Sequence, residues 1–285
     1  MNRISNSIRK VNGKPFKTIH NPGVVLEPDF VTADEEKLLM KETLLLKEKY
    51  SFSASSIHLE AKNSSTKRLV HAHRVTGRPE LDHQIKAPWF YGDRFHRSAL
   101  DSYPAISKLA TKIESIMKND NEVPVELRDI TINYRSNAMF MLDPHIDPHD
   151  DGRHVFILGL QSATVLTLTP DINLLMKNPA IFKNHIEPPM KMRNQIDAIS
   201  ALSWTDIDID ILMNKRSLLH LKNDARYSFK HAIRAGVEVD SAALPDDEDH
   251  KRFKEQHTVI CDWFGSMNDL IPRDQERTSI ILAFK

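Results

Sequence analysis

The chain has 285 residues and a mass of 32.7 kDa, enough for one large domain or two small ones with a self-sufficient hydrophobic core. Hydrophobic residues make up 40% and charged residues 27% of the sequence, which excludes a collagen, a coiled-coil rod and a wholly disordered protein. The 39 basic and 39 acidic residues cancel, so any affinity for nucleic acid or an anionic membrane has to be local.

The cysteine content and the N-terminus bear on the compartment. A single cysteine, Cys261, cannot form an internal disulfide, which predicts a reducing compartment such as the cytoplasm or the nucleus. No apolar stretch of about 18 residues is present, so we expect no membrane-spanning helix. Residues 1–22 contain basic but no acidic residues, and we interpret them as a basic, flexible tail. A mitochondrial transit peptide is the alternative interpretation of this tail.

Two helices are predicted in the N-terminal part of the chain. Thr32 and Glu35 form a capping-box pattern, which predicts the start of a helix. A second helix is predicted from about Tyr103 to Met117, where apolar residues recur at helical offsets. Leucines that return after seven residues predict the apolar stripe of the first helix: Leu38, Leu39, Leu45 and Leu46.

From Val125 onward the pattern changes to short strands. Ile130 and Ile132 alternate with polar residues ahead of Tyr134. Further β-rich runs follow at 155–158, 164–166, 217–219, 227–233 and 278–284. Helices followed by many short strands predict an α+β protein built on a sandwich or a jelly-roll barrel. Two stretches, 171–215 and 238–275, are long for loops, and we interpret them as insertions of the barrel.

The sharpest local motif is Asp143-Pro144-His145-Ile146-Asp147. In an extended segment residues i and i+2 point the same way, so His145 and Asp147 would aim an imidazole and a carboxylate at one divalent metal ion. Because the chain has 14 histidines, this triplet alone is a weak signal, and a polar surface turn is the alternative interpretation.

A third candidate ligand, His231, lies in a predicted strand. Alternation places it on the apolar, inward side of that strand, on one face with Tyr227, Phe229 and Ile233. Two histidines and one carboxylate, with open positions left over, form the facial triad of non-haem Fe(II) oxygenases. A core histidine bonded to the backbone is the alternative interpretation of His231 alone.

The last predicted strand adds a cationic group. Arg277 and Ser279 share one of its faces, and an arginine at the start of an apolar strand can form a two-pronged bond to a carboxylate. The alternative is a surface arginine paired with Glu276 or Asp274.

The order of these motifs resembles the AlkB family of Fe(II)/2-oxoglutarate dioxygenases. The resemblance covers about Ile130 to Thr169 and Arg216 to Gly236, with the closing strand added. The tyrosine-containing strand that runs into D-P-H-x-D is most similar to the AlkB homologue 4 subgroup. The resemblance implies one dioxygenase domain over 23–285, with N-terminal helices and a substrate lid in 23–124 and a double-stranded β-helix (jelly-roll) core in 125–285.

The resemblance also implies the site residues. His145, Asp147 and His231 would bind Fe(II), with 2-oxoglutarate and O2 as cosubstrates. The residues implied to line the 2-oxoglutarate pocket are Arg277, which would bind the distal carboxylate, and Tyr134 and Ser279.

The sequence departs from the family pattern in two places. The second arginine that the family often has six residues after the first is Ala283 here, so Lys285 is the candidate substitute. The stretch from His231 to Arg277 is longer than is usual in the family, because the insertion 238–275 lies between them.

The implied reaction is oxidative N-demethylation, which releases formaldehyde, succinate and CO2. The implied substrates are methyl-lysine in a protein such as actin, or N6-methyladenine or another alkylated base in nucleic acid. Trp89, Tyr91 and Arg94 lie in a basic, aromatic segment and are candidates for the lid. Such side chains stack on a base, hold a methylammonium group, or anchor the lid to the barrel.

A monomer is the expected state of the protein. Two further classes of function stay open at this point. One is a catalytically silent barrel that binds a partner through its insertions. The other is a dinuclear metal hydrolase with His149, Asp150 or Asp151 as extra ligands. A solvated turn is the alternative interpretation of these three residues.

Overall fold

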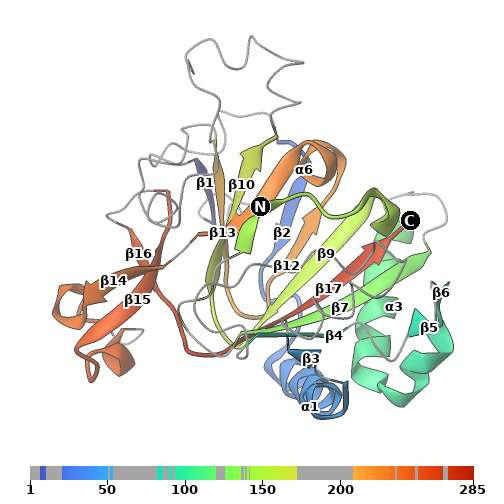
Figure 1. Cartoon of the computed structure of the whole chain (residues 1–285), viewed down its shortest axis with the longest axis horizontal. Helices are drawn as coiled ribbons and strands as arrows, with labels where there is room; N and C mark the ends of the chain where they lie inside the picture. Colours follow the sequence, from blue (N-terminus) through green and yellow to red (C-terminus); the bar gives the residue numbers. More distant parts are fainter. Residues whose placement is uncertain are drawn as a thin grey trace, which may run out of the picture.

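The computed structural model describes residues 7–10, 21–50, 52–53, 82–85, 90–91, 94–119, 126–135, 138, 140, 142–171, 208–234, 236–247, 250–265 and 269–285. Their strands form two large antiparallel sheets, a small three-stranded sheet and a short hairpin (Figure 1). None of the described helices is long and apolar enough to cross a membrane.

The larger sheet has seven strands in the order β2-β12-β9-β17-β7-β4-β3. Their bounds are Val24–Glu27 (β2), Leu218–Leu221 (β12), His154–Leu160 (β9), Arg277–Phe284 (β17), Leu127–Arg135 (β7), Asp82–Ile85 (β4) and Phe52–Ser53 (β3). The last of these strands in the chain, β17, lies in the middle, between β9 and β7.

The second sheet has five strands in the order β1-β11-β10-β13-β8. Their bounds are Ile8–Lys10 (β1), Ile209–Met213 (β11), Thr164–Pro170 (β10), Phe229–Ile233 (β13) and Leu142–His145 (β8). From β7 to β13, consecutive strands alternate between the two large sheets, except that β10 and β11 are neighbours in the same sheet. After the three strands of the small sheet, β17 returns to the seven-stranded sheet.

The two large sheets enclose an apolar core. Alternate side chains of each strand point into the space between them, because successive residues of a strand face opposite ways. This shared core contains Ile157 and Leu219 from the seven-stranded sheet and Leu168 and Ile211 from the five-stranded sheet. The fold is therefore two layers of sheet with one interior.

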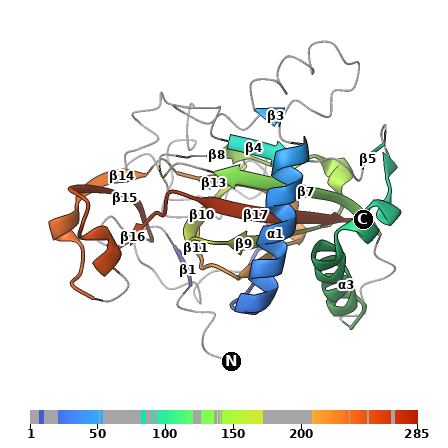
Figure 2. The same ribbon diagram turned by 90° about the horizontal axis from the view of Figure 1, so that it is seen from below.

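Two helices cover the other face of the seven-stranded sheet (Figure 2). They are α1 (Ala33–Tyr50) and α3 (Pro104–Asn119), and a 3-10 helix (Arg97–Ser102) precedes α3. The predicted capping box is present: Glu35 N donates to Thr32 Oγ1 at 3.1 Å, and Thr32 N donates to Glu35 Oε2 at 3.0 Å. Both helices were placed correctly from their sequence patterns.

The apolar stripe of α1 is narrower than predicted. Leu39 and Leu46 are buried in the core, whereas Leu38 and Leu45 are 57% and 52% exposed. Neighbouring residues of a helix lie about 100° apart, so only one leucine of each adjacent pair faces the sheet.

Two strands correct the expected domain boundaries. β1 lies in the segment expected to be a flexible tail, yet it pairs with β11 and its Ile8 is 1% exposed. Burial of the apolar Ile8 side chain in the core stabilises this strand, although the residues that follow it are basic. β11 lies inside 171–215, so the expected insertion ends before Ile209, and residues 172–207 lie outside the described part of the chain.

The segment 238–275 carries most of a small sheet, β14-β15-β16, which packs on the five-stranded sheet through buried charges. Its strands are Val237–Asp240, Thr258–Trp263 and Leu270–Pro272, with 3-10 helices at Ser241–Ala243 and Lys251–Phe253. Asp262 accepts hydrogen bonds from Arg273 at 2.5 Å and from the backbone N–H of Val165 on β10 at 3.0 Å. Arg234, just after β13, is paired with Asp210 on β11 at 2.7 Å and donates to the backbone carbonyl of Trp263 on β15 at 2.8 Å. Buried charges with such partners anchor the segment to the core.

Candidate metal centre

The two histidines predicted as metal ligands face each other across a strand pair. His145 ends β8, and its Cα partner on β13 is His231. Residues directly opposite in an antiparallel pair point to the same face, which brings the ring centroids to 4.2 Å. β13 begins only at Phe229, because Asn223–Tyr227 forms a short helix, α6. Tyr227 is therefore not on the strand face of His231, contrary to the prediction.

Asp147 completes the group from the segment that follows β8. Its Oδ1 lies 3.5 Å from Nε2 of His145 and 3.7 Å from Nε2 of His231. One ligand atom from each residue falls within 4.8 Å of the other two. Ligand atoms bonded at about 2.1 Å to one metal ion lie about 3 Å apart. The three side chains therefore need to move only slightly toward one another to bind a single ion. Among the described residues, this is the group of three that could hold a metal ion.

The protonation states of the group suit metal binding. Burial lowers the pKa of His231 to about 4, and Asp147 only partly opposes this shift. Burial alone would raise the pKa of Asp147, but His231, the hydrogen bond from His145 and the charge of Arg226 hold it well below its ordinary value. At neutral pH the His231 imidazole is therefore neutral and the carboxylate is ionised, the forms in which both bind metal. The donor set is compatible with iron.

Arg277 lies on the opposite sheet and faces the same interior. The next residues on its face of β17 are Ser279, which is 2% exposed, and Ile281, which packs against the core between the sheets. Arg277 is 5% exposed, and its buried Nε has no hydrogen-bond partner among the described residues. Burial lowers its pKa to about 10, and Arg135, its partner across the strand pair, adds to the shift. Arg277 is thus a charged group held in the interior, and the surface arginine considered above is wrong.

Tyr134 does not line this interior, contrary to the prediction. It packs in the apolar layer between the seven-stranded sheet and the helices, and its hydroxyl donates to the backbone carbonyl of Thr43 on α1. Burial raises the pKa of Tyr134 well above its ordinary value. The reason is parity: Tyr134 shares the face of Ile130 and Ile132, whereas Arg135 points to the side of Arg277.

Lys285 does not replace the missing second arginine. It is exposed, and its backbone pairs with Glu126 at the far end of β17. It lies eight positions along the chain from Arg277, an extended span of about 26 Å.

The alternative ligands and the lid remain without structural support. His149 and Asp150 are exposed in the 3-10 helix His149–Asp151, and the ring of His149 stacks on Tyr227 at 5.0 Å. The backbone of Tyr91 pairs with that of Arg94 in the hairpin formed by β5 (Phe90–Tyr91) and β6 (Arg94–Phe95). Their side chains, and Trp89 as a whole, lie outside the described residues.

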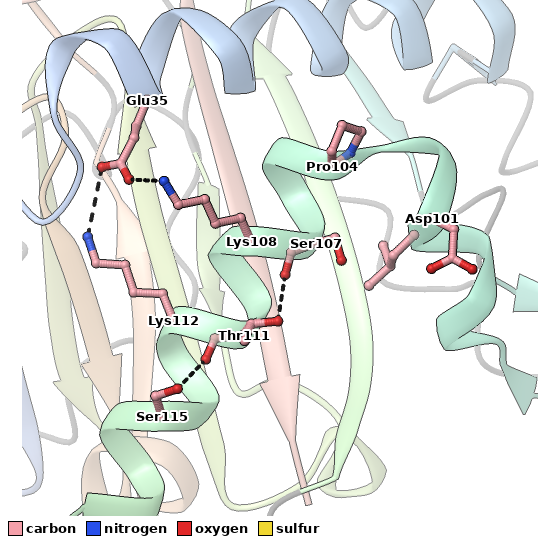
Figure 3. Close-up of a pocket in the computed structure, with 9 residues that line it drawn as sticks. Glu35, Asp101, Pro104, Ser107, Lys108, Thr111, Lys112 and Ser115 are labelled. Carbon is pink, nitrogen blue, oxygen red and sulfur yellow. Dashed lines mark hydrogen bonds and ion pairs between the residues drawn. The ribbon is translucent and has the colours of Figure 1, made fainter.

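A surface pocket lined by residues of α1 and α3 is separate from the group of His145, Asp147 and His231 (Figure 3). Glu35 on α1 faces two lysines of α3 across it, Lys108 at 3.1 Å and Lys112 at 3.9 Å. None of its lining residues belongs to the metal-capable group. These ion pairs tie α1 to α3 on the other side of the seven-stranded sheet.

Sequence reasoning missed one residue beside the metal-capable group. Arg226 on α6 is 2% exposed and donates three hydrogen bonds to backbone carbonyls of the segment that carries Asp147. In the sequence Arg226 stands just before a strand with a candidate ligand, and this position by itself does not predict burial.

No family model matches the sequence, and neither does any curated protein sequence. Among solved structures, the chain is similar to a prolyl hydroxylase from Trichoplax adhaerens in complex with a hypoxia inducible factor oxygen degradation domain peptide. The identity is 14%, the TM-score is 0.48, and the alignment covers 99% of this chain and 89% of that one. A second is SnoN, a non-heme alpha ketoglutarate dependent epimerase from nogalamycin biosynthesis, at 13% identity and a TM-score of 0.45, covering 92% and 78%. These likenesses are too low to assign a family, so the function proposed below rests on the residues of this chain.

Proposed function

We propose that this protein is an Fe(II)- and 2-oxoglutarate-dependent dioxygenase of the AlkB type. The observation that carries the proposal is that a His/Asp/His group and a buried arginine with an unpartnered Nε face one interior from opposite sheets. A facial triad leaves metal positions for a bidentate cosubstrate, and an arginine suits the far carboxylate of that cosubstrate. A catalytically silent barrel has no need of either feature.

The strand order supports this assignment. Eight strands, β7 to β13 and β17, alternate between two facing sheets as described above. This is the arrangement expected of a jelly-roll, or double-stranded β-helix, core. The metal-capable residues come from β8, β13 and the segment after β8, and the arginine comes from β17. The chemistry would therefore take place inside the barrel.

Each residue has a defined task in this proposal. Bound Fe(II) would supply the oxidising chemistry together with 2-oxoglutarate and O2. His145, His231 and Asp147 would hold the metal, and the neutral His231 imidazole would bind it without first losing a proton. Arg277 would bind and orient the distal carboxylate of 2-oxoglutarate, with Ser279 beside it. The two packed sheets would exclude water from the site.

We further propose oxidative N-demethylation as the reaction. Hydroxylation of an N-methyl group gives an unstable hydroxymethyl amine, which releases formaldehyde and leaves the free amine, while 2-oxoglutarate becomes succinate and CO2. The resemblance to the AlkB homologue 4 subgroup supports methyl-lysine and N6-methyladenine or another alkylated base alike. The zero net charge mildly favours the protein substrate, because binding to DNA regardless of sequence depends on positive charge.

Cosubstrate binding tests the dioxygenase directly. Anaerobic addition of Fe(II) and 2-oxoglutarate should give a visible charge-transfer band, and exposure to air should give succinate. Asp147→Ala should lose both signals, whereas Asp101→Ala, which changes an exposed carboxylate near α3, should keep both. If the wild-type protein shows neither the band nor succinate, the proposal is wrong.

A formaldehyde-release screen across methylated DNA, methylated RNA and methyl-lysine peptides tests the reaction and ranks the substrates. Formaldehyde release with one class, and its loss in Asp147→Ala, is the expected result. Succinate formation without formaldehyde from any of the three would point to a hydroxylase that is not a demethylase.

A further inference from the structure

Asp147 is held differently from the two histidines. His145 and His231 lie in paired strands, so the backbone hydrogen bonds of the five-stranded sheet fix their positions. Asp147 lies two residues beyond the end of β8, outside that pairing, in a segment that continues into the 3-10 helix His149–Asp151. A metal ligand in such a segment needs another support to keep its geometry.

That support comes from the side chain of Arg226. Its Nη1 donates to the carbonyl of Asp147 at 2.9 Å, its Nη2 to the carbonyl of Pro148 at 2.5 Å, and its Nε to the carbonyl of Gly152 at 3.1 Å. One guanidinium therefore binds the beginning and the end of the segment. A planar group with several fixed donors can make these three bonds at once, whereas the ammonium of a lysine is a single point.

Arg226 projects from a fixed platform. Two backbone hydrogen bonds attach α6 and the residue before it to the segment that leads into β2: Lys222 N donates to Gly23 O at 2.9 Å and Ala225 N donates to Pro22 O at 2.7 Å. After one intervening residue, α6 leads into β13, which carries His231. The same short stretch of chain thus positions one ligand directly and a second through the guanidinium.

We propose that Arg226 is a positioning residue of the metal centre, which clamps the segment 147–152 so that the Asp147 carboxylate faces the two histidines before metal binds. The clamp rests on the proposed function only in requiring that the group binds a metal ion. Its tests use metal alone, without 2-oxoglutarate, oxygen or substrate, so a failure of the dioxygenase assignment leaves them intact.

Co²⁺ titration of the folded, metal-free protein, followed by its visible absorption, measures the effect. Arg226→Lys should weaken Co²⁺ binding about ten- to a hundredfold, the usual cost of losing an outer support of a metal ligand. The matched control is Arg97→Lys, which removes an arginine bonded to Glu114 at 2.9 Å in the helix layer and should leave Co²⁺ affinity unchanged. Unfolding temperatures of both metal-free variants separate lost stability from lost affinity.

A wild-type affinity in Arg226→Lys would overturn the clamp, whatever its unfolding temperature. Absence of Co²⁺ binding by the wild-type protein would instead overturn the metal centre itself. These two failures are distinguishable in one titration series.

Amide hydrogen exchange on the wild-type protein tests the clamp even if the Arg226 variants do not fold. Because the clamp exists without metal, the amide protons of Asp151 and Gly152, which donate to the carbonyls of Pro148 and His149 at 3.1 Å, should be protected in the metal-free protein, with little further slowing when Co²⁺ is added. Fast exchange that becomes slow only with Co²⁺ would show that the metal, rather than Arg226, orders the segment.

Discussion

The two faces of the seven-stranded sheet come from the same strands but differ in chemistry. On β17, Ile280 and Leu282 point into the apolar layer beneath the helices, whereas Arg277 and Ser279 point between the sheets. The alternation of a strand thus lets one element supply both a stabilising core and the candidate site. A shift of one residue would exchange the two sets, so correct register matters here for function as well as for stability.

Truncation on the helix-covered face should give the largest loss of stability. Leu282 is 0% exposed in that layer, and Leu282→Ala should lower the free energy of unfolding by about 2–5 kcal/mol, the usual cost of a buried leucine. Denaturant unfolding measures this loss. Affinity for 2-oxoglutarate under conditions where the variant is folded should match the wild type, and a large change in that affinity would mean that the two faces are coupled.

On the face between the two sheets, a substitution should weaken 2-oxoglutarate binding without lowering stability. Arg277→Met should raise the 2-oxoglutarate requirement about tenfold or more, because the ligand loses its charged partner. The unfolding free energy of the ligand-free protein should not fall, since the variant removes a buried charge whose Nε has no partner. Iron binding should be intact. An unchanged 2-oxoglutarate requirement would place the carboxylate site elsewhere.

Two histidines with lowered pKa values, the buried His231 on β13 and the half-buried His220 on β12, predict how stability depends on pH. Burial lowers the pKa of His231 to about 4 and that of His220, which bonds His154 at 3.0 Å, to about 3. Both bind protons more weakly in the folded than in the unfolded chain, so stability should fall as pH drops below about 6.5 toward these values. Thermal unfolding between pH 7.5 and 4.5 measures the slope. His220→Leu should reduce it, and an identical slope would show that His220 does not contribute.

The smallest expected effect concerns Tyr134. Tyr134→Phe removes the hydroxyl that donates to Thr43 and should cost about 1 kcal/mol of stability without changing the 2-oxoglutarate requirement. Unfolding and cosubstrate titration measure the two quantities. A raised 2-oxoglutarate requirement would return Tyr134 to the pocket and contradict its position beneath α1.

Features with a short-range pattern could be predicted from the sequence. The capping box of Thr32 and Glu35 and the faces of β17 follow from spacings of three and two residues, and the structure has both. His145 and Asp147 were predicted from their spacing, and His231 from strand alternation. The alternation of β7 also predicts the face of Tyr134, because Tyr134 continues the series of Ile130 and Ile132 that points toward the helices, whereas the family resemblance implies the other face.

Features that depend on distant partners could not be predicted in this way. β1 becomes a strand because Ile8 pairs with Ile211, and no local pattern contains that information. Arg226 is buried because carbonyl groups more than seventy residues earlier in the chain accept its hydrogen bonds. Charged residues in a polar stretch look solvent-exposed until the tertiary structure supplies their partners.

The central place of β17 has a consequence for the order of folding. Its two neighbours, β7 and β9, are synthesised more than a hundred residues earlier, and each keeps an unpaired edge until residues 277–284 arrive. Pairing between segments so far apart is slow, and open strand edges invite association with other chains. A chain cut before Arg277 would expose both edges at once, so we expect the newly made protein to be prone to association with other chains until β17 is inserted.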